Sequence, residues 1–118
     1  MVEILRDEGN FVAMKLSGKL TDADYKQFVP VIQAATEKGK LHLLVDMTEF
    51  QGWDAPAFWD DFKFDARLGD KMERIAFIGD KKWQEWMAKI CKPFTRAQIQ
   101  YFDANDAKDA WAWVQDGL

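Results

Sequence analysis

The order of apolar segments along the chain is the feature that most constrains its fold. Two apolar runs between Ile4 and Leu16 flank the sequence Asp-Glu-Gly-Asn, a composition that favours a tight turn and predicts a β-hairpin. After the hairpin, stretches with helical spacing alternate three times with short apolar stretches typical of buried strands, and a helical stretch follows the last of them. This order predicts an α/β fold, with a five-stranded, mostly parallel sheet, an N-terminal hairpin and four helices.

Capping and turn residues predict where the first two helices begin and end. Thr21 and Asp24 have the spacing of a capping box, so the first helix is expected to begin there, and Gly39 is expected to end it. Pro56 predicts the first turn of the second helix, because a backbone N–H is not needed at that position. This second helix is expected to run to the neighbourhood of Gly69.

The later elements have comparable signals. Asp80 and Asp103 each follow an apolar run and precede a helical pattern, so we expect them to cap the third and fourth helices. Four residues of the last helix are expected to face the sheet: Ala107, Ala110, Trp111 and Val114. Trp113 lies roughly opposite and is either a contact residue or a covered surface residue. The strands predicted between the helices are Leu41–Met47, Ile75–Ile78 and Gln98–Phe102.

Composition limits the classes of protein to which the chain can belong. Its 118 residues, 48% apolar and 31% charged, predict a single domain over residues 1–118 and exclude a disordered chain. A net charge of −4 without a cluster of cations argues against nucleic acid binding. No apolar run is long enough for membrane insertion, and no secretory signal is visible. With Cys91 as its one cysteine, the chain is expected to be cytoplasmic.

Three carboxylates are expected at the carboxyl ends of parallel strands, where α/β proteins commonly bind ligands. They are Asp46, Asp80 and Asp103, and together they could hold Mg²⁺ or act in general acid–base chemistry. Helix capping explains Asp80 and Asp103 better, and Asp46 is expected to bond to the backbone near Thr48. An enzyme built on these three acids is therefore the least favoured of the functional hypotheses.

The remaining reactive side chains also favour structural roles. His42 lies within an apolar strand and is expected to be a satisfied structural histidine, and Cys91 lies beside an apolar helical stripe and is expected to be buried and inert. One histidine and one cysteine exclude a Cys/His zinc site. No nucleophile elbow, phosphate-binding loop or dinucleotide-binding motif occurs, so we expect no enzyme and no cofactor.

The segment between residues 50 and 64 is unusually rich in aromatic side chains. One face of the predicted second helix can fill the core, whereas Phe64 points away from that face and Trp53 lies in the preceding loop. Aromatic side chains left outside a core often mark an interface. The alternative is that Phe64 packs under the following loop and Trp53 covers the start of the helix. The expected contact surface comprises Trp53, Asp54, Phe58, Trp59, Asp61 and Phe64.

This ordered set of segments resembles the SpoIIAA-like family, which is related to the STAS domains of anti-sigma factor antagonists. The resemblance covers nearly the whole chain and rests on Gly18–Thr21 with Asp24–Tyr25, Leu44–Asp46, Phe50–Trp53, Trp59–Phe64, Ile75–Asp80 with Trp83, and Ala110–Trp113. It implies the SpoIIAA-like superhelix of alternating strands and helices, in agreement with the order read from apolar periodicity.

The resemblance also implies a regulatory function. STAS relatives switch partners through a phosphorylated serine at the start of the second helix, but the corresponding residues here, Trp53–Pro56, carry no hydroxyl group, and the nearest one upstream is on Thr48. The expected function is a non-enzymatic regulatory or protein-interaction module that lacks this serine and self-associates as a homodimer through the contact surface. The alternative is a protein that binds a small apolar molecule or lipid in a pocket lined by Trp53, Trp59 and Phe62.

Overall fold

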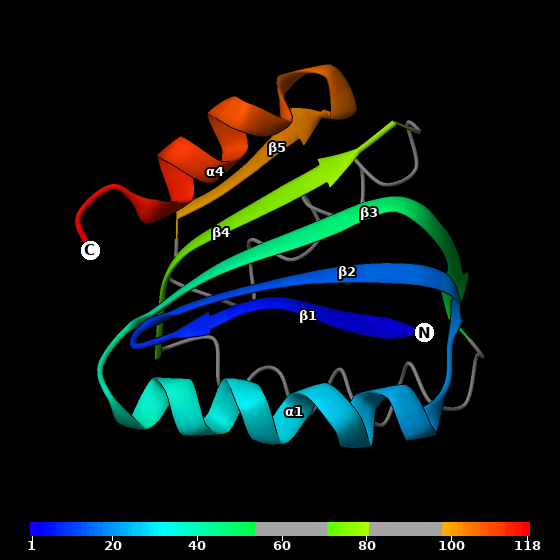
Figure 1. Cartoon of the computed structure of the whole chain (residues 1–118), viewed down its shortest axis with the longest axis horizontal. Helices are drawn as coiled ribbons and strands as arrows, with labels where there is room; N and C mark the ends of the chain where they lie inside the picture. The colour runs from blue at the N-terminus through cyan, green and yellow to red at the C-terminus, as the bar shows by residue number, and fades with distance from the viewer. Residues whose placement is uncertain (54–70, 81–97) are drawn as a thin grey trace.

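A computed structural model describes residues 1–53, 71–80 and 98–118 of the chain (Figure 1). Its elements are β1 (Val2–Glu8), β2 (Phe11–Leu20), α1 (Asp22–Glu37), β3 (Leu41–Trp53), β4 (Met72–Gly79), β5 (Gln98–Asp103), the 3₁₀ turn η3 (Ala104–Asp106) and α4 (Ala107–Gln115). The helices α1 and α4 are the first and fourth predicted helices. The predicted second and third helices, with Cys91, lie outside the described residues.

The strands form one five-stranded sheet in the order β1-β2-β3-β4-β5, with β1 antiparallel to β2 and every other neighbouring pair parallel. A continuous row of paired residues crosses the four parallel strands: Val12, Leu43, Ile75 and Ile99. The α/β fold and the mostly parallel sheet with an N-terminal hairpin are thereby confirmed. The whole row is apolar, as expected for strands covered on their faces.

The hairpin closes through a turn of two residues. Glu8 pairs with Phe11, and between them Gly9 has a φ of 56°, a backbone conformation that glycine adopts at little cost. The pairing of β1 with β2 shifts register between Ile4 and Arg6, so that Leu5 forms a β-bulge. The turn thus forms where the sequence predicts it, within Asp-Glu-Gly-Asn.

The predicted capping box begins α1. The Thr21 hydroxyl accepts a hydrogen bond from the backbone N–H of Asp24, and the Asp24 carboxylate accepts one from the backbone N–H of Thr21. The helix ends at Glu37, and Gly39 follows with a φ of 137°. This backbone conformation favours glycine, and a Cβ atom at position 39 would lie 2.9 Å from Nδ2 of Asn10, so the Asn10 side chain would have to move.

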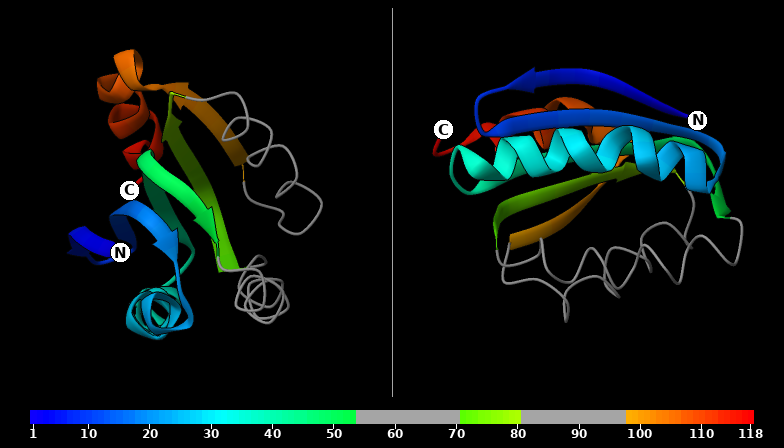
Figure 2. Two further views of the ribbon diagram at one scale, coloured as in Figure 1. Left: turned by 90° about the vertical axis from the view of Figure 1, so that its right-hand side faces the viewer. Right: turned by 90° about the horizontal axis from the view of Figure 1, so that it is seen from below.

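Successive residues along the strands point to opposite faces of the sheet and build two apolar cores. Val12, Met14, Leu43 and Val45 belong to the core under α1, and α1 itself lies against β1, β2 and β3. The core under α4 contains Phe11, Ala13, Leu44, Ala76 and Ile78, with α4 lying against β3, β4 and β5. The two helices therefore cover opposite faces and different halves of the sheet (Figure 2).

The start of the last helix differs from the prediction. Asp103 ends β5 in an extended conformation and makes no side-chain capping bond, and η3 intervenes before α4 begins at Ala107. The prediction that Asp103 caps this helix is therefore wrong, because the extra turn separates the two. The inward face is as expected, since Ala110 and Val114 are wholly buried. No helix in the described residues is long and apolar enough to span a bilayer.

Candidate functional site

The carboxyl end of β3 leads into the predicted contact surface. The sequence places Trp53 in a loop, but in the structure Trp53 is the last residue of β3 and pairs with Leu20 of β2. The strand is longer than predicted because the end of β2 continues beside it: Gly18 pairs with Phe50. The other five residues of the contact surface lie outside the described residues, so this surface stays a prediction. Phe50, the first ring of the aromatic segment, is wholly buried.

The three acids at the strand ends do not form a metal site. The Oδ1 atom of Asp46 accepts hydrogen bonds from the backbone N–H of Thr48 at 3.0 Å and from its hydroxyl at 2.8 Å, as predicted. Asp80 follows β4 and Asp103 ends β5. Within residues 1–53, 71–80 and 98–118, no three histidine, cysteine or carboxylate side chains are placed to hold a metal ion. Oδ1 of Asp46 is therefore occupied by hydrogen bonds to Thr48, two residues further along the chain.

His42 joins the sheet to the last helix. Its side chain is buried, and Nδ1 lies 2.5 Å from the carbonyl oxygen of Val114. Since a carbonyl only accepts hydrogen bonds, Nδ1 carries the proton and donates it. The last carbonyl groups of a helix have no partner within the helix. His42 is therefore a satisfied structural residue, as the sequence analysis expects.

Arg74 has the same role on the neighbouring strand, and the sequence analysis does not identify it. Its guanidinium donates a hydrogen bond of 2.8 Å to the carbonyl oxygen of Trp113 and lies 3.5 Å from the Asp116 carboxylate. The same group lies over the indole ring of Trp113, 5.1 Å from its centroid. Trp113 also packs against Phe102 at a centroid distance of 5.9 Å, so this half-buried residue helps to hold α4 to the sheet.

A hollow of about 580 Å³ lies at the amino ends of the parallel strands, opposite to the end where the sequence predicts ligands. It is lined by Glu8, Asn10, Lys40, His42, Glu73, Arg74, Asp116, Gly117 and Leu118. Most of these side chains are polar or charged, and Lys40 and Glu73 form an ion pair of 3.8 Å across it. This lining does not suit an apolar ligand. The pocket expected at Trp53, Trp59 and Phe62 involves side chains outside the described set.

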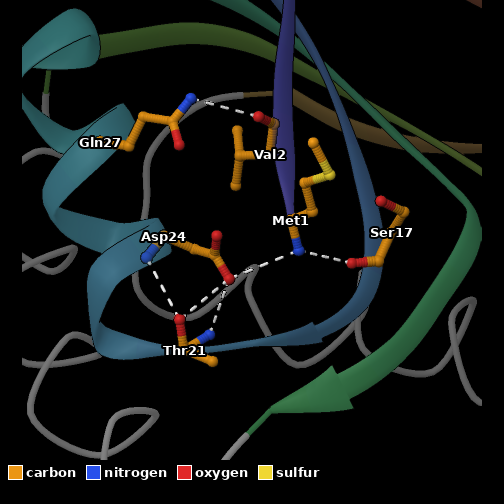
Figure 3. Close-up of polar contacts among 6 residues, drawn as sticks. All are labelled: Met1, Val2, Ser17, Thr21, Asp24 and Gln27. Atoms are coloured by element: carbon orange, nitrogen blue, oxygen red, sulfur yellow. Dashed lines mark hydrogen bonds and ion pairs between the residues drawn. The ribbon is translucent and has the colours of Figure 1, made fainter.

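A polar cluster anchors the first strand to the start of α1 (Figure 3). The amino group of Met1 donates a 2.6 Å hydrogen bond to the carbonyl oxygen of Ser17 and lies 3.4 Å from the Asp24 carboxylate. Gln27 donates a hydrogen bond to the carbonyl oxygen of Val2 at 3.2 Å. Desolvation alone would raise the pKa of Asp24, but the hydrogen bonds from Thr21 and the nearby ammonium group outweigh it and lower the pKa below 3.8.

These features define an α/β protein whose sheet has one antiparallel strand at its edge and whose His42 and Asp46 side chains are used in structural bonds. A family model described as SpoIIAA-like matches residues 11–115, and the chain belongs to the SpoIIAA-like family. A similar solved structure is that of an uncharacterised protein of the DUF3478 family with a SpoIIAA-like fold from Shewanella loihica PV-4. It is 32% identical, with a TM-score of 0.78, and the match covers 97% of this chain and 92% of the other. No match was found among curated proteins.

Proposed function

We propose that this chain is a non-enzymatic regulatory or protein-interaction module that self-associates. The observation that carries the proposal is the use of its most reactive described side chains: His42 caps the end of α4, and Asp46 bonds to Thr48. Groups committed in this way are poorly placed for acid–base chemistry, which needs a base within hydrogen-bond reach of a substrate proton. Membership of the SpoIIAA-like family supports the same conclusion.

The proposed contact surface for a protein partner comprises Trp53, Asp54, Phe58, Trp59, Asp61 and Phe64. Its first residue continues a strand whose core residues are fixed: Met47 and Phe50 are buried almost completely. A rigid strand that leads into a contact surface reduces the entropy lost on binding. Because Trp53–Pro56 lack a hydroxyl group, the module is proposed to bind without the phosphoserine switch of its STAS relatives.

Partner capture with matched baits tests this proposal. Wild-type protein, Trp53→Ala, Phe64→Asp and the control Gln51→Ala would be immobilised at equal density, because Gln51 is exposed on the same strand. We expect one set of proteins to be retained by the wild type and the control and lost from the other two baits. Identical retention by all four baits would contradict the proposed surface.

A further inference from the structure

The edge of the sheet formed by β1 carries charged side chains and an exposed apolar one. Within the described residues β1 pairs only with β2, and it forms one border of the sheet (Figure 2). Four of its seven side chains are charged, and Leu5 is one of three exposed large apolar residues in the described part of the chain. The opposite edge, β5, has no charged residue before its last position.

The direction of the backbone groups of β1 follows from its hydrogen bonds. Met1 and Ser17 exchange both backbone bonds, so the polar groups of Met1 point toward β2. These groups alternate along a strand, and the Val2 carbonyl accordingly points the other way and accepts a bond from Gln27. The same alternation directs the N–H and C=O of Ile4 outward, away from β2. After the bulge at Leu5, the next outward residue is Asp7.

We propose that a second copy of this chain pairs with β1 in antiparallel orientation, with a twofold axis at Ile4. Ile4 then exchanges two backbone hydrogen bonds with Ile4 of the second copy. In each copy, Leu5 and Arg6 form the bulge and together count as one position. Glu3 then lies opposite Arg6 of the second copy, and Val2 lies opposite its Asp7. The contact is self-complementary, as twofold symmetry requires. This inference rests on the self-association in the proposed function and leaves the surface around Trp53 for an unlike partner.

Charge selects this register over its neighbours. Outward backbone groups must face one another, so the second copy can shift only by two positions at a time. A shift in one direction places Glu3 opposite Glu3 of the second copy, and a shift in the other places Arg6 opposite Arg6. Like charges directly opposite each other are destabilising in sheets. Of these three registers, only the one centred on Ile4 pairs opposite charges at both sites.

The same pairing extends an alternating row of charges across the sheet. Lys15 on β2 lies beside Glu3 in the register and forms an ion pair of 3.3 Å with Glu49 on β3. No ion pair is formed by Glu3 within the described part of the chain, whereas Arg6 lies 3.6 Å from Glu8. Arg6 of the second copy would provide the cation that Glu3 lacks. Charges on edge strands commonly prevent pairing, but here they disfavour the two registers next to the proposed one.

Charge reversal tests this contact, because a double variant is expected to restore what each single variant removes. Glu3→Arg places arginine opposite arginine at both sites, and Arg6→Glu places glutamate opposite glutamate. Each variant is expected to weaken the dimer about 30-fold, because two facing pairs change from attraction to repulsion. The double variant Glu3→Arg/Arg6→Glu restores both pairs and is expected to dimerise like the wild type. Dissociation constants would be measured by sedimentation equilibrium up to high micromolar concentration, since a contact this small is expected to be weak.

An equimolar mixture of the two single variants gives the decisive result. In the mixed pair, each site joins an arginine of the Glu3→Arg chain to a glutamate of the Arg6→Glu chain. Two chains that associate poorly with themselves are therefore expected to associate with each other. The controls are Asp109→Arg and Lys108→Glu, which make the same charge changes at exposed positions of α4 and are expected to leave the dimer unchanged. Circular dichroism of every variant verifies that folding is unaffected.

Two results would overturn the inference, and they differ in what they say about the proposed function. If the wild type dimerises and the single variants dimerise equally well, the β1 contact is wrong while self-association stands; loss of the dimer in Phe64→Asp would then locate it on the other surface. If the wild type stays monomeric throughout, self-association and the β1 contact are both wrong, while partner capture still tests the surface around Trp53.

Discussion

Nδ1 of His42, near the start of β3, lies 2.5 Å from the carbonyl oxygen of Val114, near the end of α4. Arg74 makes the equivalent bond to Trp113 from β4. Two neighbouring strands thus donate to carbonyl groups in the last turn of α4, and the Trp113 carbonyl also accepts a hydrogen bond from the backbone N–H of Asp116 at 3.3 Å. The Arg74 guanidinium also lies at the end of the helix where its dipole favours positive charge. His42 and Arg74, which line the hollow, therefore also hold α4 to the sheet.

Replacing His42 with phenylalanine is expected to destabilise the fold. The ring volume is retained, but the Val114 carbonyl loses its donor within a buried site, and the expected loss is about 1–3 kcal/mol of unfolding free energy. Urea denaturation measures it, with Gln100→Ala as an exposed control expected to change stability by less than about 0.5 kcal/mol. Equal stability of His42→Phe and the wild type would show that this bond contributes nothing.

Arg74→Met is expected to loosen α4 from the sheet. The variant loses the hydrogen bond to Trp113 and the contact of the guanidinium with its ring, with an expected cost of about 1–2 kcal/mol. Asp116→Asn is the matched control: the Asp116 side chain is 75% exposed, so its ion pair with Arg74 is expected to contribute little. Hydrogen exchange of the α4 amides reports the local effect. A cost as large for Asp116→Asn as for Arg74→Met would contradict this division.

Asp24 makes stability depend on pH in the acid range. Its pKa is lowered in the folded chain, so its contribution is fully present above the usual value of 3.8 and is lost as the pH falls through the lower folded value. We expect Asp24→Asn to be less stable than the wild type at neutral pH and the difference to shrink below pH 3.8. Denaturation curves at a series of pH values measure this. A difference that stays constant into acid would show that the Asp24 charge is not involved.

Gly39 and Gly9 provide a matched pair of glycines with positive φ. Alanine at position 39 would meet Asn10, whereas alanine at position 9 would meet nothing within 4 Å. We therefore expect Gly39→Ala to cost about 2–3 kcal/mol and Gly9→Ala about 1 kcal/mol, since the second carries only the backbone penalty. Thermal denaturation of the two variants compares them. Equal costs for the two variants would mean that the close approach to Asn10 relaxes without cost.

Local signals in the sequence predicted local structure well. The capping box of Thr21 and Asp24 involves residues three apart, and the Asp46–Thr48 bond involves residues two apart. Both depend on side chains whose neighbours are fixed by the chain itself. The alternation of apolar stretches likewise predicted an α/β fold with a mostly parallel sheet, because burial against helices requires that pattern.

Features that depend on distant residues were not predictable in the same way. The partner of His42 is 72 positions away, and Arg74 has no local pattern that indicates its contact with Trp113. The polar residues after Met47 indicate a loop, yet the strand continues to Trp53 because β2 continues beside it. The length of β3 is therefore set by its pairing with β2, and the spacing of apolar side chains along β3 does not indicate that pairing.

The mass of the wild-type chain in solution, measured by sedimentation equilibrium as concentration rises through the micromolar range, tests the central claim of a self-associating module most directly. We predict that the weight-average mass rises from that of one chain, 13.7 kDa, toward that of two. A mass that remains at 13.7 kDa at the highest concentration would contradict the claim.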